Sequence, residues 1–172
     1  VHGDGRVGAA LVASKPDYIF MTGSTATGKK IMQTAAETLT PVALELGGKD
    51  AMIVLEDAEL EAAARWGAWG AFFNTGQTCM SVERVYVVES KYDEFVNLAV
   101  QQAQELKSGY STELNSPFFM GPVTDQRQVK IIDGHLQDAL DKGAKILTGG
   151  KRDGMFYDPI VLVNVDHSMK IM

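Results

Sequence analysis

The chain has 172 residues, of which 45% are hydrophobic and 22% charged, a balance typical of a globular domain with a sizeable core. No basic stripe offsets its formal net charge of −6, which argues against a nucleic-acid partner. No apolar run reaches the roughly 18 residues of a membrane span, so we expect no membrane partner. The single cysteine excludes a disulfide scaffold and suits a reducing compartment.

Short apolar runs rich in β-forming residues predict the strands. The first is expected to be buried and ends at Gly23, and the second is closed by Gly47-Gly48. The predicted strands are residues 18–21, 41–46, 51–55, 85–88 and 144–147.

Apolar residues at spacings of four predict the first two helices, and capping residues with glycines at the far ends predict the other two. Trp66 and Trp69 lie on the second helix, where we expect them to serve packing. Strands that alternate with helices are typical of an α/β fold with a largely parallel sheet. The first predicted helix covers residues 28–39, and the second has Asp57 as its N-cap and runs toward Phe73. Ser90 and Asp93 open the third, which Gly109 closes, and Thr124 is the N-cap of the fourth, which ends at Gly143.

The double glycine Gly47-Gly48 is the best candidate for a domain boundary, because two glycines after a strand make a low-cost hinge. It would separate residues 1–46 from residues 47–172. The chain begins at Val1 without an initiator Met and ends at Met172 without a closing helix. We interpret it as the middle of a longer protein.

The turn from Gly23 to Gly28 links a strand to a helix and is rich in small residues. Unpaired N–H groups and the helix dipole favour a phosphate at such a helix start. The pattern is neither the dinucleotide fingerprint nor a P-loop, so an ordinary strand-to-helix turn is an equal alternative.

Glu45 is an acidic residue inside an apolar strand, between Leu44 and Leu46. Such a residue is unfavourable when buried unless it is paired or functional. One interpretation is a side chain that points outward from an edge strand. The other is a general base held in a partly apolar pocket.

Cys79 is the only cysteine and lies in a predicted loop between a helix and a strand. Free cysteines are most often buried and inert, whereas a thiolate nucleophile needs exposure and an electropositive environment. The three histidines, His2, His135 and His167, are scattered, so they support neither a Cys–His pair nor a metal site.

Three stretches occur in this order: residues 20–28 (FMTGSTATG), 44–49 (LELGGK) and 76–79 (GQTC). Together they closely resemble the motifs of the NAD(P)-dependent aldehyde dehydrogenase superfamily. Glu45 and Cys79 lie 34 residues apart, as in that family. The resemblance covers essentially the whole chain and extends to residues 121–123, 157–159 and 165–169.

The resemblance implies a parallel-sheet, Rossmann-like aldehyde dehydrogenase fold. Residues 1–46 would be the end of the NAD(P)-binding domain, and residues 47–172 would be the first part of the catalytic domain. It also implies a small-molecule aldehyde as substrate, NAD or NADP as cofactor, and no metal.

The resemblance also implies residue roles. Cys79 would attack the aldehyde to give a thiohemiacetal, which hydride transfer converts to a thioester, and its backbone N–H would be half of an oxyanion hole. Glu45 would activate the water that hydrolyses the thioester. The implied cofactor-binding residues are Gly23, Ser24, Thr25, Thr27 and Gly28 in the phosphate-facing turn, and the backbone of Leu46 beside the nicotinamide.

Other parts of the family pattern are absent from these residues. The second oxyanion donor, an asparagine, belongs before Val1, and the segment that holds the nicotinamide ribose belongs after Met172. We therefore expect the 172-residue chain alone to be inactive. We expect its parent to be an active homo-oligomer in the cytoplasm or an organellar matrix.

Two alternatives remain open. An acylating dehydrogenase would pass the thioester to coenzyme A, but a water-activating base at Glu45 suits hydrolysis better. A non-catalytic structural or interaction protein on the same fold is disfavoured by the presence of both Cys79 and Glu45.

Overall fold

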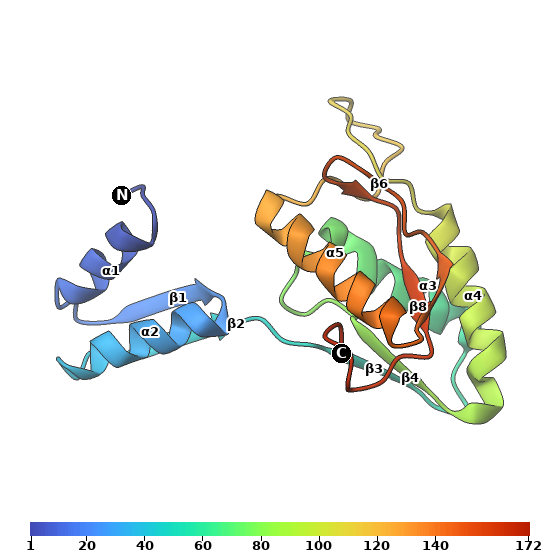
Figure 1. The fold of residues 1–172 in the computed structure, drawn as a ribbon, viewed down its shortest axis with the longest axis horizontal. Helices are drawn as coiled ribbons and strands as arrows, with labels where there is room; N and C mark the ends of the chain where they lie inside the picture. Colours follow the sequence, from blue (N-terminus) through green and yellow to red (C-terminus); the bar gives the residue numbers. More distant parts are fainter. The chain divides into compact units, whose positions relative to one another are not determined.

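The computed structural model describes all of residues 1–172, which divide into two compact units, Val1–Gly48 and Lys49–Met172. Helices and strands alternate along the first unit and at the start of the second, in which two helices then follow each other and four strands come last (Figure 1). None of the helices combines the length and the apolar character that a bilayer crossing requires.

The first unit combines a two-stranded parallel sheet with two helices. α1 (Gly5–Ala13) precedes β1 (Ile19–Gly23), and α2 (Thr25–Ala36) connects β1 to β2 (Val42–Leu46). Both predicted strands are confirmed. α1 was not predicted, since it carries two glycines and buries none of its residues.

α2 begins at Thr25, three residues before the predicted start at Gly28. Ser24 is the N-cap, and its hydroxyl oxygen accepts a hydrogen bond from the backbone N–H of Thr27 at 3.2 Å. This bond satisfies one of the free N–H groups of the first turn. The small residues that suggested a long turn are therefore the first turn of the helix.

The prediction that β1 is a buried strand is wrong for one of its two faces. Ile19 is buried, but Phe20 is 67% exposed. Side chains alternate across a strand, so Phe20 lies on the face opposite to Ile19 and Met21. An apolar run therefore indicated the strand correctly but did not show how much of it is covered.

The second unit begins with a parallel pair of strands and two helices that cover it. β3 (Ala51–Val54) pairs with β4 (Arg84–Val87). α3 (Leu60–Phe72) lies between them in sequence, and α4 (Tyr92–Glu105) packs against α3 (Figure 1). Their core consists of Val54, Leu60, Ala64 and Phe95.

The rest of the second unit is built around α5 (Gln126–Asp141) and two antiparallel strand pairs. β5 (Lys145–Thr148) was predicted, but its antiparallel partner β8 (Val161–Val163) was not. β6 (Arg152–Asp153) and β7 (Phe156–Tyr157) form a short hairpin. Two buried clusters support this part: Val123, Val129 and Tyr157, and Ala139, Ala144 and Met169.

Two predicted helix limits of the second unit are wrong. Asp57 is not the N-cap of α3, because a turn closes from the Ala58 N–H to the Leu55 carbonyl and the helix starts only at Leu60. α4 ends at Glu105 and does not reach Gly109, whose N–H donates to the carbonyl of Met120.

The predicted caps of α4 and α5 are also wrong. Ser90 lies in a short 3-10 helix, η2 (Glu89–Lys91), and the N-cap of α4 is Lys91. Asp125 caps α5 by accepting a hydrogen bond from the Arg127 N–H at 2.7 Å. The hydroxyl of Thr124 donates instead to the side chain of Gln77.

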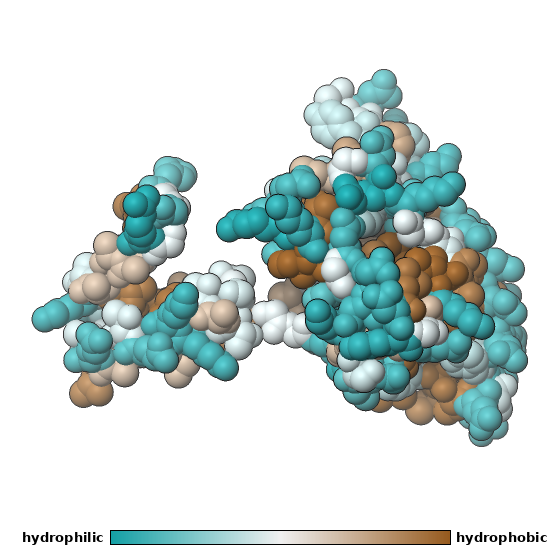
Figure 2. Space-filling model, viewed as in Figure 1, coloured by the Kyte–Doolittle hydropathy of each residue, from teal (hydrophilic) through white to brown (hydrophobic).

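Trp66 and Trp69 are more exposed than we expected for packing residues, at 60% and 47%. Trp69 stacks on Phe73 with ring centroids 4.9 Å apart, so its main partner is another exposed aromatic ring. Apolar side chains also form patches elsewhere on the surface of the second unit, between hydrophilic ones (Figure 2).

Candidate active site

The start of α2 carries most of the predicted cofactor-binding residues. Ser24 caps the helix, and its hydroxyl donates to Oγ1 of Thr27 at 3.0 Å. The first turn contains no acidic residue. A capped helix start without negative charge suits an anion, because the dipole and the free N–H groups both favour one.

Gly28 lets α2 lie close to β2. A Cβ atom at this position would be 3.0 Å from Cδ2 of Leu46 and 3.2 Å from Cδ1 of Leu44. Both distances are shorter than ordinary van der Waals contact, so a Cβ would require the two leucine methyl groups to shift, and a larger side chain would push the helix and strand apart. The glycine therefore helps to set where the first turn of α2 lies relative to the end of β2.

Glu45 and Leu46 end β2 beside this turn. In the parallel register, Thr22 pairs with Glu45, and Gly23 pairs with Leu46. The first unit thus brings Gly23, the start of α2, Glu45 and Leu46 to one edge of its sheet. Glu45 is exposed, which agrees with an outward-pointing side chain and shows no apolar pocket around it within this unit.

Cys79 belongs to the second unit, on a loop that joins α3 to β4. We call residues 74–82 the Cys79 loop. The thiol is exposed, and Cys79 lies in a turn after the 3-10 helix η1 (Phe73–Gly76). Its backbone N–H has no acceptor within the chain. This exposure favours the interpretation of Cys79 as a nucleophile over its interpretation as an inert, buried residue.

The Cys79 loop starts with three consecutive residues in the left-handed region. The φ angles are 52° at Asn74, 61° at Thr75 and 71° at Gly76. A β-branched residue rarely adopts such a backbone, which costs on the order of 1–3 kcal/mol. A hydrogen bond from the Thr75 hydroxyl to the Gly121 carbonyl, at 3.0 Å, helps to hold it there.

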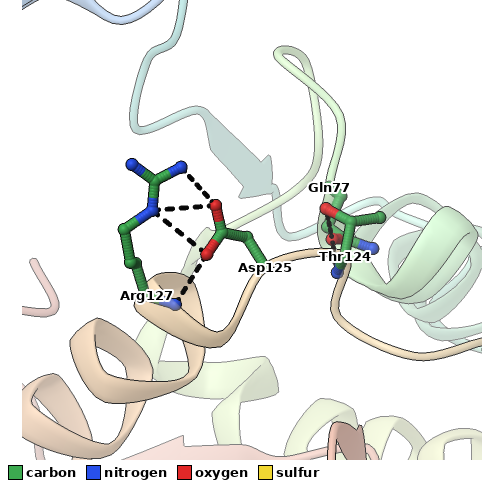
Figure 3. A network of polar contacts seen from close by, with 4 residues as sticks. All are labelled: Gln77, Thr124, Asp125 and Arg127. Atoms are coloured by element: carbon green, nitrogen blue, oxygen red, sulfur yellow. Dashed lines mark hydrogen bonds and ion pairs between the residues drawn. The ribbon is translucent and has the colours of Figure 1, made fainter. Parts of the chain in front are cut away.

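The side-chain amide of Gln77 fixes the next part of the loop. Its nitrogen donates to the carbonyls of Asn74 at 3.1 Å and Pro122 at 3.3 Å. Its oxygen accepts from the backbone N–H of Thr124 at 2.9 Å and from the Thr124 hydroxyl at 3.1 Å (Figure 3). These bonds connect the loop to a segment more than forty positions away in sequence.

The end of the Cys79 loop is held by a buried hydroxyl. Ser81 is 3% exposed, and its hydroxyl donates to the Gly76 carbonyl at 3.3 Å. The N–H of Val82 donates to the Gly70 carbonyl of α3 at 3.1 Å. Cys79 is therefore the exposed middle of a loop that is bonded to the protein on both sides.

A salt bridge stands beside this network, at the start of α5. The guanidinium and the backbone N–H of Arg127 both donate to the carboxylate of Asp125 (Figure 3). The side-chain hydrogen bonds from Arg127 lower the pKa of Asp125 to about 2. Asp125 therefore stays charged as the cap of α5 throughout the neutral range.

The whole chain, residues 1–172, matches the family model described as the aldehyde dehydrogenase family. The chain belongs to the aldehyde dehydrogenase family. Among curated family members, it is 43% identical to a 4,4'-diapolycopene aldehyde oxidase of Methylomonas sp over 172 residues. That match covers 100% of this chain and 32% of the relative.

Solved aldehyde dehydrogenase structures share the fold. PutA from Anabaena variabilis has a TM-score of 0.93 at 44% identity, over 99% of this chain and 37% of its own. A glyceraldehyde-3-phosphate dehydrogenase from Bacillus halodurans, complexed with NADP, has a TM-score of 0.90 at 38% identity. This match covers 99% of the present chain and 35% of the relative. The predicted α/β aldehyde dehydrogenase fold is confirmed, and the chain spans about a third of these relatives.

Sequence reasoning missed the residues that hold the Cys79 loop. Gln77 was noted only as part of a motif, and the left-handed backbone of Asn74 and Thr75 was not foreseen. A run of polar residues between the apolar helix α3 and the strand β4 was the available signal. It marked a loop, but the partners at Pro122 and Thr124 are too distant in sequence to be inferred from it.

Proposed function

We propose that this chain is part of an NAD(P)-dependent aldehyde dehydrogenase that oxidises an aldehyde to a carboxylic acid. One observation carries the proposal: the only cysteine is exposed on a loop bonded at both sides, in a chain that matches the family over its whole length. The domain roles of residues 1–46 and 47–172, and the residue roles below, are parts of the same proposal.

Cys79 is the proposed nucleophile. Its sulfur attacks the aldehyde carbon and forms a thiohemiacetal, so the thiol must be accessible to a small molecule and must lose its proton. The exposed position of Cys79 meets the first requirement. Loss of hydride from the same carbon then leaves an acyl group on sulfur as a thioester.

The backbone N–H of Cys79 is a proposed oxyanion donor. Attack on the aldehyde turns the carbonyl oxygen into an alkoxide, which a fixed N–H donor stabilises. This N–H has no acceptor within the chain, so it is free to donate to substrate oxygen. The hydrogen bonds of Gln77 and Ser81 on either side limit how far it can move.

Glu45 is the proposed base for the second half of the reaction. A carboxylate that takes a proton from water generates the nucleophile that hydrolyses the thioester. Its exposed side chain, at the carboxyl end of β2, is accessible to water. Hydrolysis gives a free acid, which distinguishes this reaction from acyl transfer to coenzyme A.

The first turn of α2 fits the diphosphate of NAD or NADP, because it has a capped N-terminus, small residues and no acidic side chain. Gly23 and Ser24 would face the phosphates, with Thr25, Thr27 and Gly28 completing the turn. The backbone of Leu46 would border the nicotinamide end. When bound, the cofactor supplies the hydride acceptor. The NADP complex of the Bacillus halodurans relative supports NAD or NADP as the cofactor.

The parent protein, in this proposal, is a homo-oligomer in the cytoplasm or an organellar matrix. The lone Cys79 has to remain a free thiol to act, and a reducing compartment keeps it so.

The test is Cys79→Ala in the parent protein, with formation of reduced cofactor followed for a panel of aldehydes. We expect aldehyde oxidation to be abolished while cofactor binding and the thermal midpoint stay near those of wild type. Turnover within tenfold of wild type would contradict the proposal. A tenfold loss is only about 1.4 kcal/mol of barrier, too little for removal of a covalent nucleophile.

Product analysis separates the proposal from the acylating alternative. With coenzyme A added, we expect the free carboxylic acid as the product. An acyl thioester of coenzyme A in its place would assign the chain to acyl transfer.

A further inference from the structure

The side-chain amide of Gln77 uses its entire hydrogen-bonding capacity. An amide has two N–H donors and two oxygen lone pairs. Here both donors are used, toward the carbonyls of Asn74 and Pro122, and the oxygen accepts twice from Thr124. We call these four hydrogen bonds the Gln77 clamp (Figure 3 shows the two to Thr124).

Among side chains of this length, only glutamine can make all four hydrogen bonds of the clamp. Its partners are two carbonyls, which need a donor, and an N–H with a hydroxyl, which need an acceptor. A glutamate carboxylate has no donor, so it would face two carbonyl oxygens without a proton between them. The clamp therefore depends on one particular functional group.

The clamp lies two positions before Cys79 and works together with the left-handed turn. Thr75 donates to Gly121, and Gln77 binds Pro122 and Thr124, so two loop side chains bind one segment, residues 121–124. That segment leads directly into α5, which is capped by Asp125. The Cys79 loop is thus bonded to a segment that contains the buried Val123 and that leads into a capped helix.

We infer that Gln77 is a positioning residue. Its clamp holds the Cys79 sulfur within reach of the aldehyde carbon and the Cys79 N–H within reach of the aldehyde oxygen. The inference rests on the proposed function, since it concerns the same thiol. In this role Gln77 positions the thiol of Cys79 but does not activate it, because Gln77 binds backbone carbonyls and Thr124 and has no bond to Cys79. Small misplacements of reacting atoms slow enzymes about a hundredfold.

The main test is Gln77→Glu in the parent protein, which keeps the size of the side chain and removes both donors. We expect the single-turnover burst of reduced cofactor to slow about ten- to hundredfold. We expect alkylation of Cys79 by iodoacetamide to stay within threefold of wild type, because a small reagent still reaches a displaced exposed thiol. The control is Gln128→Glu, the same charge change on the exposed first turn of α5, with a burst within twofold of wild type.

A milder variant covers the case in which Gln77→Glu does not fold. Thr124→Val removes one of the four bonds and leaves the backbone N–H of Thr124 in place. We expect its burst to slow two- to fivefold with unchanged alkylation. Where both variants fold, adding Thr124→Val to Gln77→Glu should change the burst by less than twofold, because both act on the same contacts.

Hydrogen exchange reports the clamp without any aldehyde chemistry. The Thr124 N–H donates to Gln77, so its exchange should be faster in Gln77→Glu than in wild type or Gln128→Glu. If Cys79→Ala were active, the proposed function would fail while this exchange difference still reported the clamp.

Any of four results would overturn the inference. The first two are a burst within twofold of wild type in folded Gln77→Glu, and an unchanged burst in Thr124→Val. The third is alkylation that falls in step with the burst, which would make Gln77 a determinant of thiol reactivity. The fourth is unchanged exchange at Thr124 in Gln77→Glu, which would mean that the clamp does not form in solution.

Discussion

Thr22 and Glu45 are direct partners in the parallel ladder of β1 and β2, one position before the pair formed by Gly23 and Leu46. This register places the carboxylate of the proposed base at the same sheet edge as the capped start of α2. Ligands of parallel α/β sheets bind at the carboxyl ends of the strands. The pairing therefore puts the proposed base and the proposed phosphate-binding turn at the same edge, where ligands of such sheets bind.

Glu45→Gln should separate the two halves of the reaction. The amide cannot take a proton from water, so thioester hydrolysis and steady-state turnover should fall by about a hundredfold or more. The single-turnover burst should remain within about threefold of wild type. Glu37→Gln, at an exposed position in the same unit, is the control and should change neither rate. A burst lost in parallel with turnover would place Glu45 in the first chemical step.

Gly28→Val should push α2 away from β2. The added side chain meets Leu44 and Leu46 from its first carbon, and such overpacking costs about 1–3 kcal/mol. We expect a lower thermal midpoint and a higher KM for NAD(P) in the parent protein. Gly28→Ala should have a smaller effect on both, because leucine methyl groups can shift and alanine favours the helix by about 1 kcal/mol. Equal KM values for Gly28→Val and wild type would show that this close approach does not shape the cofactor site.

Gly76→Ala should destabilise the Cys79 loop. The φ angle of Gly76 is 71°, and an added Cβ would lie 3.1 Å from the Ala71 carbonyl oxygen. We expect a loss of about 1–2 kcal/mol in the free energy of unfolding, measured by chemical denaturation. Gly134→Ala is the matched control. It lies in the exposed interior of α5 with open space around it, so it should stabilise by about 0.5–1 kcal/mol. The same sign for both substitutions would contradict the left-handed backbone at Gly76.

Tyr157 should make stability depend on alkaline pH. Its hydroxyl donates to Asp133 at 2.6 Å, and burial, followed by this carboxylate, raises its pKa to about 12 from 10.0. Because the folded-state pKa is the higher one, the contribution is complete below pH 10 and is lost as the pH rises toward about 12. Tyr157→Phe should remove this part of the pH dependence in denaturation experiments. Tyr110→Phe, at an exposed position, should not; equal slopes for the two variants would refute the assignment.

Much of the fold could be predicted from local sequence patterns. The five predicted strands are β1 to β5, and the glycine, serine and threonine residues after β1 lie at the start of α2. These features depend on neighbours in sequence, such as the Ser24 cap and its partner Thr27. The Cys79 loop was likewise foreseen as a connection between a helix and a strand.

What sequence alone determined, then, is the family, the order of the main helices and strands from β1 to β5, and the candidate residues for chemistry, Glu45 and Cys79 above all. Their identities stand in the chain itself, and local periodicity is enough to place them on a strand end and in a loop. Only the tertiary structure decided which side chains are buried and which distant segments are partners. Examples are the exposure of Phe20, the pairing of β5 with β8 and the hydrogen bonds of Gln77. The physical reason is range, because burial and long-range hydrogen bonds depend on segments that meet only when the chain folds. Gln77 and Thr124 are 47 positions apart, and nothing near either residue specifies the other.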